Sequence, residues 1–410
     1  MTSPVRSYLL ISAHYFFAFA ALGVFFPYFA LFLRENVGLT SSQVGIVISI
    51  PPLVGLFAQP AWGQVADRTG SRVNVLVFLC IGAAAGFAAL SHAQGLAATI
   101  IATFGLSLFL SALYPLGVSV AFGVLPSSSM FGRVRVWGTI GYFIVVVSAP
   151  ILLARARGLL DIKAGVPNGP SEPGLELLFY LAAACLLVAV IGLVFLPKHA
   201  GLSAQAQRGD LRALLAEPAF TRVLLFSTGI QFFLHGPMQL FPLYVRSRGG
   251  TMTDLSHLWI CMVLLEVPLI FGSSWLFARF GVTRMMLVAA AGGGVRWVVC
   301  ALVPTLAGVY PVQALHALVV TGLNVGTALY VERIVPARLR STAQSTVVMV
   351  GSSVGGVLST TLGGFVVDRW GVDVLFLVGG AGALSWVLVA GRLLEQPSAG
   401  AIPARAARIE

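Results

Sequence analysis

Apolar residues dominate this chain in long runs, and short polar segments separate one run from the next. Each run is about 20 residues long, the length an α-helix needs to cross roughly 30 Å of hydrocarbon. The first run is too long for the apolar region of a cleaved signal peptide, so we expect it to be retained. The pattern predicts twelve membrane-spanning helices, over residues 8–33, 43–65, 73–92, 97–122, 134–154, 176–196, 219–245, 256–277, 283–303, 306–330, 342–366 and 371–394.

The composition agrees with a lipid environment. Of the 410 residues, 58% are hydrophobic and only 10% are charged, whereas a soluble chain has about 25% charged residues. Mean hydropathy is +0.94. The net charge of +11 does not indicate nucleic-acid binding, because the basic residues lie in short loops without interleaved aromatics. The four cysteines stand singly inside apolar runs, so their spacing indicates neither a disulfide framework nor a metal site, and we expect no cofactor.

The distribution of Lys and Arg predicts the orientation of the chain. Seventeen lie on the side that carries both termini, seven lie on the other side, and Arg296 lies inside a run. The excess of positive charge places both termini in the cytoplasm. The longest loop on that side, KHAGLSAQAQRGDLRALLAE, follows the sixth run and contains a short amphipathic helix near Leu211–Leu215.

Corresponding motifs in the two halves predict the domain organisation. GQVADRTGSR at 63–72 follows the second run and FARFGVTR at 277–284 follows the eighth, while GRVR and ARLR precede the fifth and the eleventh. Many secondary transporters consist of two such halves, with the substrate near the membrane midplane. The sequence thus predicts an all-α integral membrane protein with two pseudo-symmetric six-helix halves. We expect an N-terminal half (1–197), a cytoplasmic central loop (198–217), a C-terminal half (218–397) and a cytoplasmic tail (398–410).

The same motifs, with YFFAFAALGVFFPYFALFL, QPAWGQVADRTG and GRVRVWGTIGY, resemble the major facilitator superfamily, in the branch that holds lactose permease and phenylpropionate permease. The resemblance covers nearly all the runs. It implies a monomeric transporter in the cell's inner or plasma membrane that couples the uptake of a small organic solute to protons. A sugar or nucleoside permease and a drug/proton antiporter remain alternatives. An integral membrane enzyme is disfavoured, because the loops are short and the titratable groups lie at mid-depth.

Three titratable or charged residues lie deep in the C-terminal runs. Glu266 stands about eleven residues into its run, in VLLEVPLIFG, and Arg296 and His316 lie at comparable depths. A charge at the membrane centre costs roughly 2.5–3.5 kcal/mol, so these side chains are expected to face a cavity or each other. In lactose permease, residues at the matching places take part in sugar binding and proton coupling. The alternative is a structural ion pair of Glu266 with Arg296.

Polar residues also form two stripes at helical spacing, which predicts that their helices line a wet cavity. The alternative is hydrogen bonding between helices, worth about 1 kcal/mol for each pair. One stripe lies in the tenth run and comprises Gln313, His316, Val320, Asn324 and Thr327. The other lies in the seventh run and comprises Ser227, Gln231, His235 and Gln239.

In the fifth run, Arg135, Thr139 and Tyr142 share one face. The resemblance implies that this face binds the substrate, with Tyr142 where the permease has a tryptophan. The permease also has a glutamate on the fourth run, and here that run offers Tyr114 and two serines but no acid. A further carboxylate, three residues after the histidine, is replaced by Val319. An arginine without a counter-ion favours a carboxylate substrate, and aromatic neighbours favour an aryl group. The alternative is that Arg135 only sets topology.

The 63–72 motif implies a conformational latch on the cytoplasmic side. Asp67 is expected to interact with the start of the eleventh run, and Gly63 and Gly70 allow close approach and a tight turn. The second copy has Ala278 at the place of the acid, so only one half can carry the latch. The latch residues are Gly63, Asp67, Arg68, Gly70, Arg72, Arg338 and Arg340.

Overall fold

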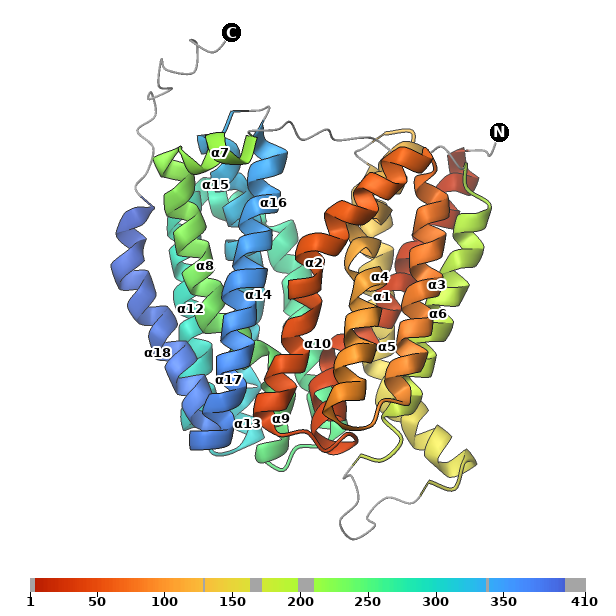
Figure 1. The fold of residues 1–410 in the computed structure, drawn as a ribbon. Coiled ribbons are helices and arrows are strands. Elements are labelled where there is room, and N and C mark those ends of the chain that lie inside the picture. Colours follow the sequence, from red (N-terminus) through yellow and green to blue (C-terminus); the bar gives the residue numbers. More distant parts are fainter. Residues whose placement is uncertain (1–3, 128–129, 163–171, 198–209, 337–338, 395–410) are drawn as a thin grey trace.

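The computed structural model describes residues 4–127, 130–162, 172–197, 210–336 and 339–394. Within these residues all regular secondary structure is helical (Figure 1). The predicted all-α class is therefore confirmed. Residues 198–209 of the central loop and 395–410 of the tail lie outside the described residues.

The first group of helices corresponds to the first six predicted runs. Each helix extends a few residues beyond the apolar segment that predicted it or ends within two residues of it. The helices are α1 (Pro4–Glu35), α2 (Ser41–Thr69), α3 (Arg72–Ser91), α4 (Gly95–Val124), α5 (Phe131–Leu159) and α6 (Glu176–Val194).

The second group is more interrupted. Its helices are α8 (Pro218–Gln239), α9 (Phe241–Ser247), α10 (Met252–Phe271), α11 (Ser273–Phe280), α12 (Val282–Leu302), α13 (Leu306–Val309), α14 (Ala314–Val319), α15 (Gly326–Ile334), α16 (Arg340–Val350), α17 (Gly356–Trp370) and α18 (Val372–Ala390). Before α8, the short helix α7 (Asp210–Leu215) confirms the helix predicted near Leu211–Leu215. Two π-helical turns, Val320–Val325 and Gly351–Gly355, join α14 to α15 and α16 to α17.

Eleven helical stretches in the described residues are long and apolar enough to cross a membrane. The predicted run 219–245 is not one of them: it is broken at Leu240 into α8 and α9, and α8, although 22 residues long, carries polar residues such as Arg222, Gln231 and His235. The count of twelve spans therefore stays a prediction. The described ends of α1 and α18 that lie nearest the termini are at the same, upper end of Figure 1, as an even number of crossings requires.

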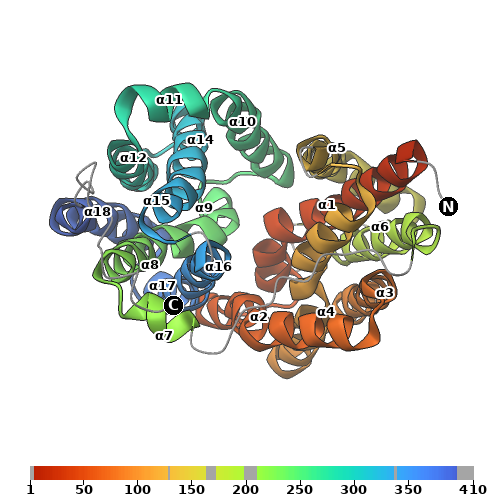
Figure 2. The same ribbon diagram turned by 90° about the horizontal axis from the view of Figure 1, so that it is seen from above.

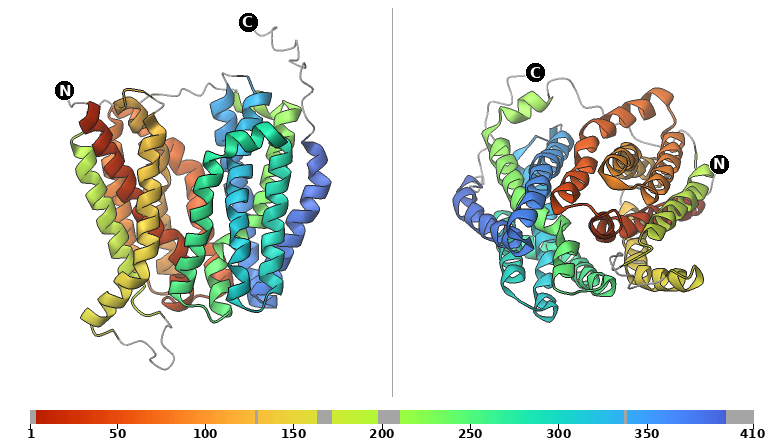
Figure 3. Two further views of the ribbon diagram at one scale, coloured as in Figure 1. Left: turned by 180° about the vertical axis from the view of Figure 1, so that it is seen from behind. Right: turned by 60° about the horizontal axis from the view of Figure 1, so that its bottom comes forward.

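The helices form two groups that lie side by side, α1–α6 and α8–α18 (Figure 2). They contact each other through α2 with α17, α5 with α10, and α1 with α9 and α10. Figure 3 shows the α5–α10 contact from behind. Helix α2 approaches α17 so closely that a Cβ on Gly45 would lie 2.3 Å from the Thr360 carbonyl oxygen. A side chain cannot fit there, so glycine allows the two helices to meet.

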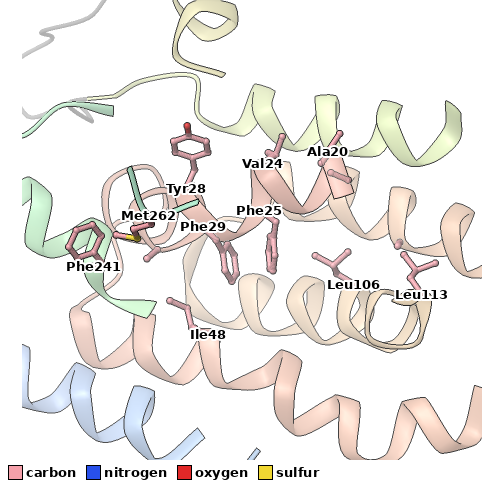
Figure 4. Packing of buried hydrophobic residues seen from close by; sticks show 14 of the residues in the cluster. Ala20, Val24, Phe25, Tyr28, Phe29, Ile48, Leu106, Leu113, Phe241 and Met262 are labelled. Carbon is pink, nitrogen blue, oxygen red and sulfur yellow. The ribbon is translucent and has the colours of Figure 1, made fainter. Parts of the chain in front are cut away.

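Buried aromatic residues of α1 extend this contact toward the second group (Figure 4). The rings of Phe25 and Phe29 stack with centroids 4.4 Å apart. Next to them, Tyr28 Oη lies 2.6 Å from Ser256 Oγ on α10, within hydrogen-bonding distance. One apolar core therefore continues from the first group into the second near the lower end of Figure 1.

The predicted orientation can be tested with cysteine labels at two exposed positions. Leu160, at the end of α5, is 59% exposed and Leu211, on α7, is 47% exposed. Leu160→Cys is expected to react with a membrane-impermeant thiol reagent added to whole cells, and Leu211→Cys only after lysis. The native cysteines are a small background, since three of the four are buried. The reverse labelling pattern would contradict the charge distribution argument.

Candidate functional site

Two cavities in the second group bring together most of the predicted polar stripes. One measures about 170 Å³ and is lined by Gln231, His235, Arg296, His316 and Asn324, among others. The other measures about 280 Å³ and extends past Thr327 to Gln344. The two adjoin, because Gln231, Leu323 and Asn324 line both. Helices α8, α12, α14, α15 and α16 and the π-helical turn after α14 therefore surround one continuous space whose walls are partly polar.

Arg296 is the buried cation of this space, with 2% of its surface exposed. Its Nε and Nη2 both donate to Gln313 Oε1, at 2.9 and 2.7 Å. The guanidinium carbon also lies 3.9 Å from the centroid of the Trp297 ring. An amide oxygen and an aromatic face hold the guanidinium in one orientation. The charge of Arg296 is therefore positioned without a carboxylate partner in the described residues.

His316 completes this arrangement. Its Nδ1 lies 3.1 Å from Arg296 Nη1. Arginine only donates hydrogen bonds, so Nδ1 must accept, and the neutral ring then carries its proton on Nε2. Because His316 also lines the 170 Å³ cavity, the imidazole offers a ligand a donor whose tautomer is set by Arg296.

Two predicted cavity residues have a different role in the structure. Gln313 is fully buried and positions Arg296, with its own Nε2 donating to the Val309 carbonyl at 3.1 Å. Gln239 lies 3.2 Å from His235, Nε2 to Nε2, and can donate to that ring. Both residues orient neighbours that line the cavity.

In the first group, Arg135 lies among aromatic rings. Its guanidinium carbon is 4.1 Å from the centroid of Phe19 and 5.9 Å from that of Tyr114. Its Nη1 donates to Thr139 Oγ1 at 3.2 Å. The structure therefore assembles Arg135, Thr139 and Tyr114 as predicted, and adds Phe19 of α1. In the described residues Arg135 has no carboxylate within 4.0 Å.

Glu266 on α10 does not pair with Arg296 in this structure. It is half-buried, and no hydrogen bond or ion pair to it occurs among the described residues. The basic group whose charge acts on it is Arg135, across the contact of α5 with α10. The charge of Glu266 also acts on Tyr142 of α5. Arg135 keeps no carboxylate within 4.0 Å in the described residues, and Glu266 of the other group interacts with it only electrostatically.

Two charged residues of the predicted latch, Asp67 and Arg340, form their described ion pairs within their own group of helices. Asp67 forms an ion pair with Arg72 of its own loop. Arg340 donates to the Val335 carbonyl at 3.2 Å and lies 3.5 Å from Glu332. Arg338 lies outside the described residues. The motif's Gly63 and Arg68 lie in the last turns of α2, and Gly70 ends that helix with a left-handed backbone at φ 63°.

The opposite, lower end is closed by contacts that the sequence did not reveal. Asp368 near the end of α17 accepts from the backbone N–H groups of Ser41 and Ser42 at 2.9 and 2.7 Å. A carboxylate at the start of α2 is favourable, because the helix dipole is positive there. Arg246 also bonds Glu35 at 2.6 Å. The sequence contained a sign of this role, because DRWG at 368–371, which includes Asp368, repeats the DRTG motif of 67–70.

Comparison with known proteins identifies relatives over most of the chain. The family model described as "MFS_1 like family" matches residues 8–378. Maltose permease of Geobacillus stearothermophilus is 31% identical over 370 residues, which is 88% of each chain. The probable 3-phenylpropionic acid transporter of Escherichia coli (strain K12) is 26% identical over 376 residues, 89% of this chain and 92% of that one.

Solved structures share the fold at low sequence identity. A crystal structure of nucleoside transporter NupG superposes with a TM-score of 0.81 at 16% identity, covering 95% of this chain and 100% of that chain. A bacterial homolog of the human lysosomal transporter Spinster, in an inward-facing and unoccupied conformation, gives a TM-score of 0.78 at 15% identity. It covers 96% of this chain and 98% of that one.

Proposed function

The chain belongs to the MFS_1 like family, and on that premise we propose that it is a monomeric proton-coupled symporter that takes up a small polyhydroxylated solute. It is a multi-pass membrane transporter, as are its relatives. The finer assignment needs a binding site for such a solute, a group that takes up the proton, and a means of alternating access. The two groups of helices supply a candidate for each.

The lining of the C-terminal cavities supports a neutral, hydroxyl-rich substrate, and this observation carries the proposal. Much of the lining is apolar, and its polar groups are chiefly amides, imidazoles and hydroxyls, from Gln231, Asn324, Gln344, His235 and Thr327, with the Arg296 guanidinium beside them. The amides, imidazoles and hydroxyls both donate and accept hydrogen bonds, as sugar hydroxyls do. The aromatic rings around Arg135 supply apolar faces for the less polar side of a ring. Maltose is therefore the first substrate to test, since the relative named above is a maltose permease.

An aromatic carboxylate is the second candidate. Arg135 presents a planar fork that matches a carboxylate bidentately, and no acid lies within 4.0 Å of it in the described part of the chain. One relative is a probable 3-phenylpropionic acid transporter. The distant charge of Glu266 weakens this case, because it already offsets part of the charge of Arg135.

Glu266 is the proposed proton carrier. Its carboxyl group has no hydrogen bond in the described structure and stands beside the α5–α10 contact. When the two groups of helices separate or close, the electrostatic effect of Arg135 on this carboxyl group weakens or strengthens. A proton bound in one state is then released in the other, which couples the proton to the movement.

Alternating access is supported by the contrast between the two ends. Asp368, Arg246 and Glu35 join the groups at the lower end, and the described latch residues stay within their own loops at the upper end. If both termini are cytoplasmic, this conformation is closed to the outside and open to the cytoplasm.

The decisive experiment measures uptake of maltose, raffinose and 3-phenylpropionate into proteoliposomes, with and without an inwardly directed proton gradient. We expect a sugar to accumulate only with the gradient, together with protons. Accumulation of 3-phenylpropionate alone would select the second candidate. Uptake that ignores the gradient would contradict proton coupling.

Arg135→Lys separates the two substrate classes. Lysine keeps the charge but cannot form the bidentate fork, so a carboxylate substrate is expected to lose affinity about tenfold or more. A sugar held mainly by the aromatic rings and the C-terminal cavity is expected to lose less. The measurement is the Kd of the transported compound in detergent. Unchanged affinity for 3-phenylpropionate would show that Arg135 does not hold its carboxylate.

Asp67→Asn tests the latch. Asp67 lies in the last turn of α2 and is not among the cavity residues, so the substitution is expected to leave substrate affinity nearly unchanged. Transport is expected to slow several-fold, because the inward-closed state loses a stabilising charge. Arg340→Gln is a matched variant on the opposite side of the proposed latch. A large loss of affinity in Asp67→Asn with normal turnover would place the residue in the binding site instead.

A further inference from the structure

A small separate cavity lies between α1 and α4. It measures about 40 Å³, and its lining includes the side chains of His14, Tyr15, Phe19 and Tyr114 together with Gly117. A single water needs roughly 10–15 Å³ of such volume. The cavity therefore has room for about one polar group with its carbon atom, such as a hydroxymethyl group.

Two polar groups in the wall of this cavity have no hydrogen-bond partner among the described residues. Tyr15 is 2% exposed and its Oη is unpaired, and His14 is 3% exposed and its Nδ1 is unpaired. The His14 ring faces the Ala189 carbonyl of α6, but outside hydrogen-bonding geometry. Buried polar groups in native proteins are nearly always paired. This arrangement is typical of a binding site in which a ligand supplies the missing hydrogen bonds.

Gly117 on α4 leaves space for such a partner. A Cβ built on this glycine would lie 3.6 Å from His14 Nε2 and 3.7 Å from Tyr15 Oη. Tyr15 Oη and the second ring nitrogen of His14, Nε2, are therefore close to the same point, where any other residue would place its side chain, while the unpaired Nδ1 is the ring atom directed toward Ala189. These distances are ordinary van der Waals contacts, so the glycine is not required by close helix packing. Its effect is to keep the space between the two polar groups free.

The cavity adjoins the Arg135 cluster. Tyr15 stacks on Phe19 with ring centroids 5.9 Å apart, and the Arg135 guanidinium carbon lies 4.1 Å from the centroid of that Phe19 ring. Tyr114 meets Phe19 edge-on at 5.8 Å and also lines the cavity. A solute held beside Arg135 can therefore extend one group past Phe19 toward Tyr15.

We propose that this cavity is a subsite for one hydroxyl group of the transported solute, and that His14 and Tyr15 determine specificity for it. A hydroxyl group can donate to His14 Nε2 and accept from Tyr15 Oη, which pairs the unpaired Oη and leaves Nδ1 to carry the ring proton toward the Ala189 carbonyl. The remaining lining, which includes Ala18, Leu110 and Leu113, is apolar and favours a neutral group over a charged one. The inference rests on the proposed function, since it requires a hydroxylated substrate.

Tyr15→Phe removes only the Oη atom. The test compares the affinity of the wild type and this variant for maltose and for each of its monodeoxy analogues. We expect the variant to bind maltose about tenfold more weakly, the effect of one lost hydrogen bond to a buried group. For one deoxy analogue, the one that lacks the hydroxyl in the subsite, the variant and the wild type are expected to bind equally.

Gly117→Ala is a second, independent test, because its added methyl group occupies the subsite without a clash. It is expected to weaken maltose binding at least tenfold and to leave binding of the same deoxy analogue nearly unchanged. Gly105→Ala is the matched control on the same helix, since nothing lies within 4 Å of a Cβ there. It is expected to bind every sugar as the wild type does.

The outcomes separate this inference from the proposed function. If Tyr15→Phe weakens all analogues equally, or none, the cavity holds a structural water and the subsite assignment is wrong. If the wild type accumulates only 3-phenylpropionate, which has no hydroxyl group, the assignment is also overturned. If the wild-type protein transports none of the sugars, both the proposed function and the subsite assignment are refuted. Normal wild-type sugar transport with no analogue-specific effect refutes the subsite alone.

Discussion

Replacing Glu266 by glutamine is expected to abolish proton-driven accumulation of the substrate while leaving exchange across the membrane largely intact. Glutamine has nearly the same shape but cannot take up or release a proton. Among the residues that the structure describes, Glu266 has no hydrogen bond that the substitution would break, so binding and folding are expected to persist. Its only described influence is electrostatic, between α10 and α5. The measurement is substrate-dependent proton uptake in proteoliposomes, beside counterflow of labelled substrate.

Asp254→Asn is a suitable control, because this residue lies on the same helix near its first turn and caps it through Thr251. It is expected to lower stability slightly and to keep accumulation. Full accumulation by Glu266→Gln would show that another group carries the proton. Loss of both counterflow and binding would make Glu266 a substrate ligand, as the family resemblance allows.

Helix positions were predictable because the membrane imposes a minimum length on each apolar run. The run 134–154 became α5 (Phe131–Leu159), for example, and the run 43–65 became α2 (Ser41–Thr69). The break at Leu240 was not predicted. Proline follows it at Pro242, and Pro237 precedes it inside α8, so the signal was present although the apolar composition hid it.

The partners of the polar residues were less predictable. A stripe at helical spacing assumes an uninterrupted α-helix, but in the tenth run the short helix α13 is followed by a 3-10 turn at Pro311–Gln313 and later by a π-helical turn at Val320–Val325. These turns change the register, so Gln313 is turned into contact with Arg296 while Asn324 lines the cavity. Sequence depth suggested Arg296 as the partner of Glu266, but the described residues show no contact between them, and Arg135, across the packing of α10 against α5, is the cation that acts on Glu266.

Arg296→Lys is expected to reduce kcat/KM for the substrate by about a hundredfold, the second large effect. The guanidinium makes two hydrogen bonds to Gln313 Oε1, one to His316 Nδ1, and a contact with the Trp297 ring. One ammonium group cannot reproduce this planar set. His316 then loses the donor that fixes its tautomer, and the cavity loses an oriented ligand. Because this is a defect of binding, residual transport is expected to remain coupled to protons, unlike transport by Glu266→Gln.

Combining the substitutions tests whether Glu266 and Arg296 act separately. If they formed an ion pair, removing one partner would leave a buried charge unpaired, and removing both would restore part of the loss. The structure predicts no such rescue, because Arg296 is held by Gln313 and His316. The free-energy effects of Glu266→Gln and Arg296→Gln on thermal stability and affinity are therefore expected to add. Glu266→Gln with Arg135→Gln is expected to deviate from additivity, since these two charges interact. Rescue in the Arg296 combination and additivity in the Arg135 combination would reassign the partner of Glu266 to Arg296.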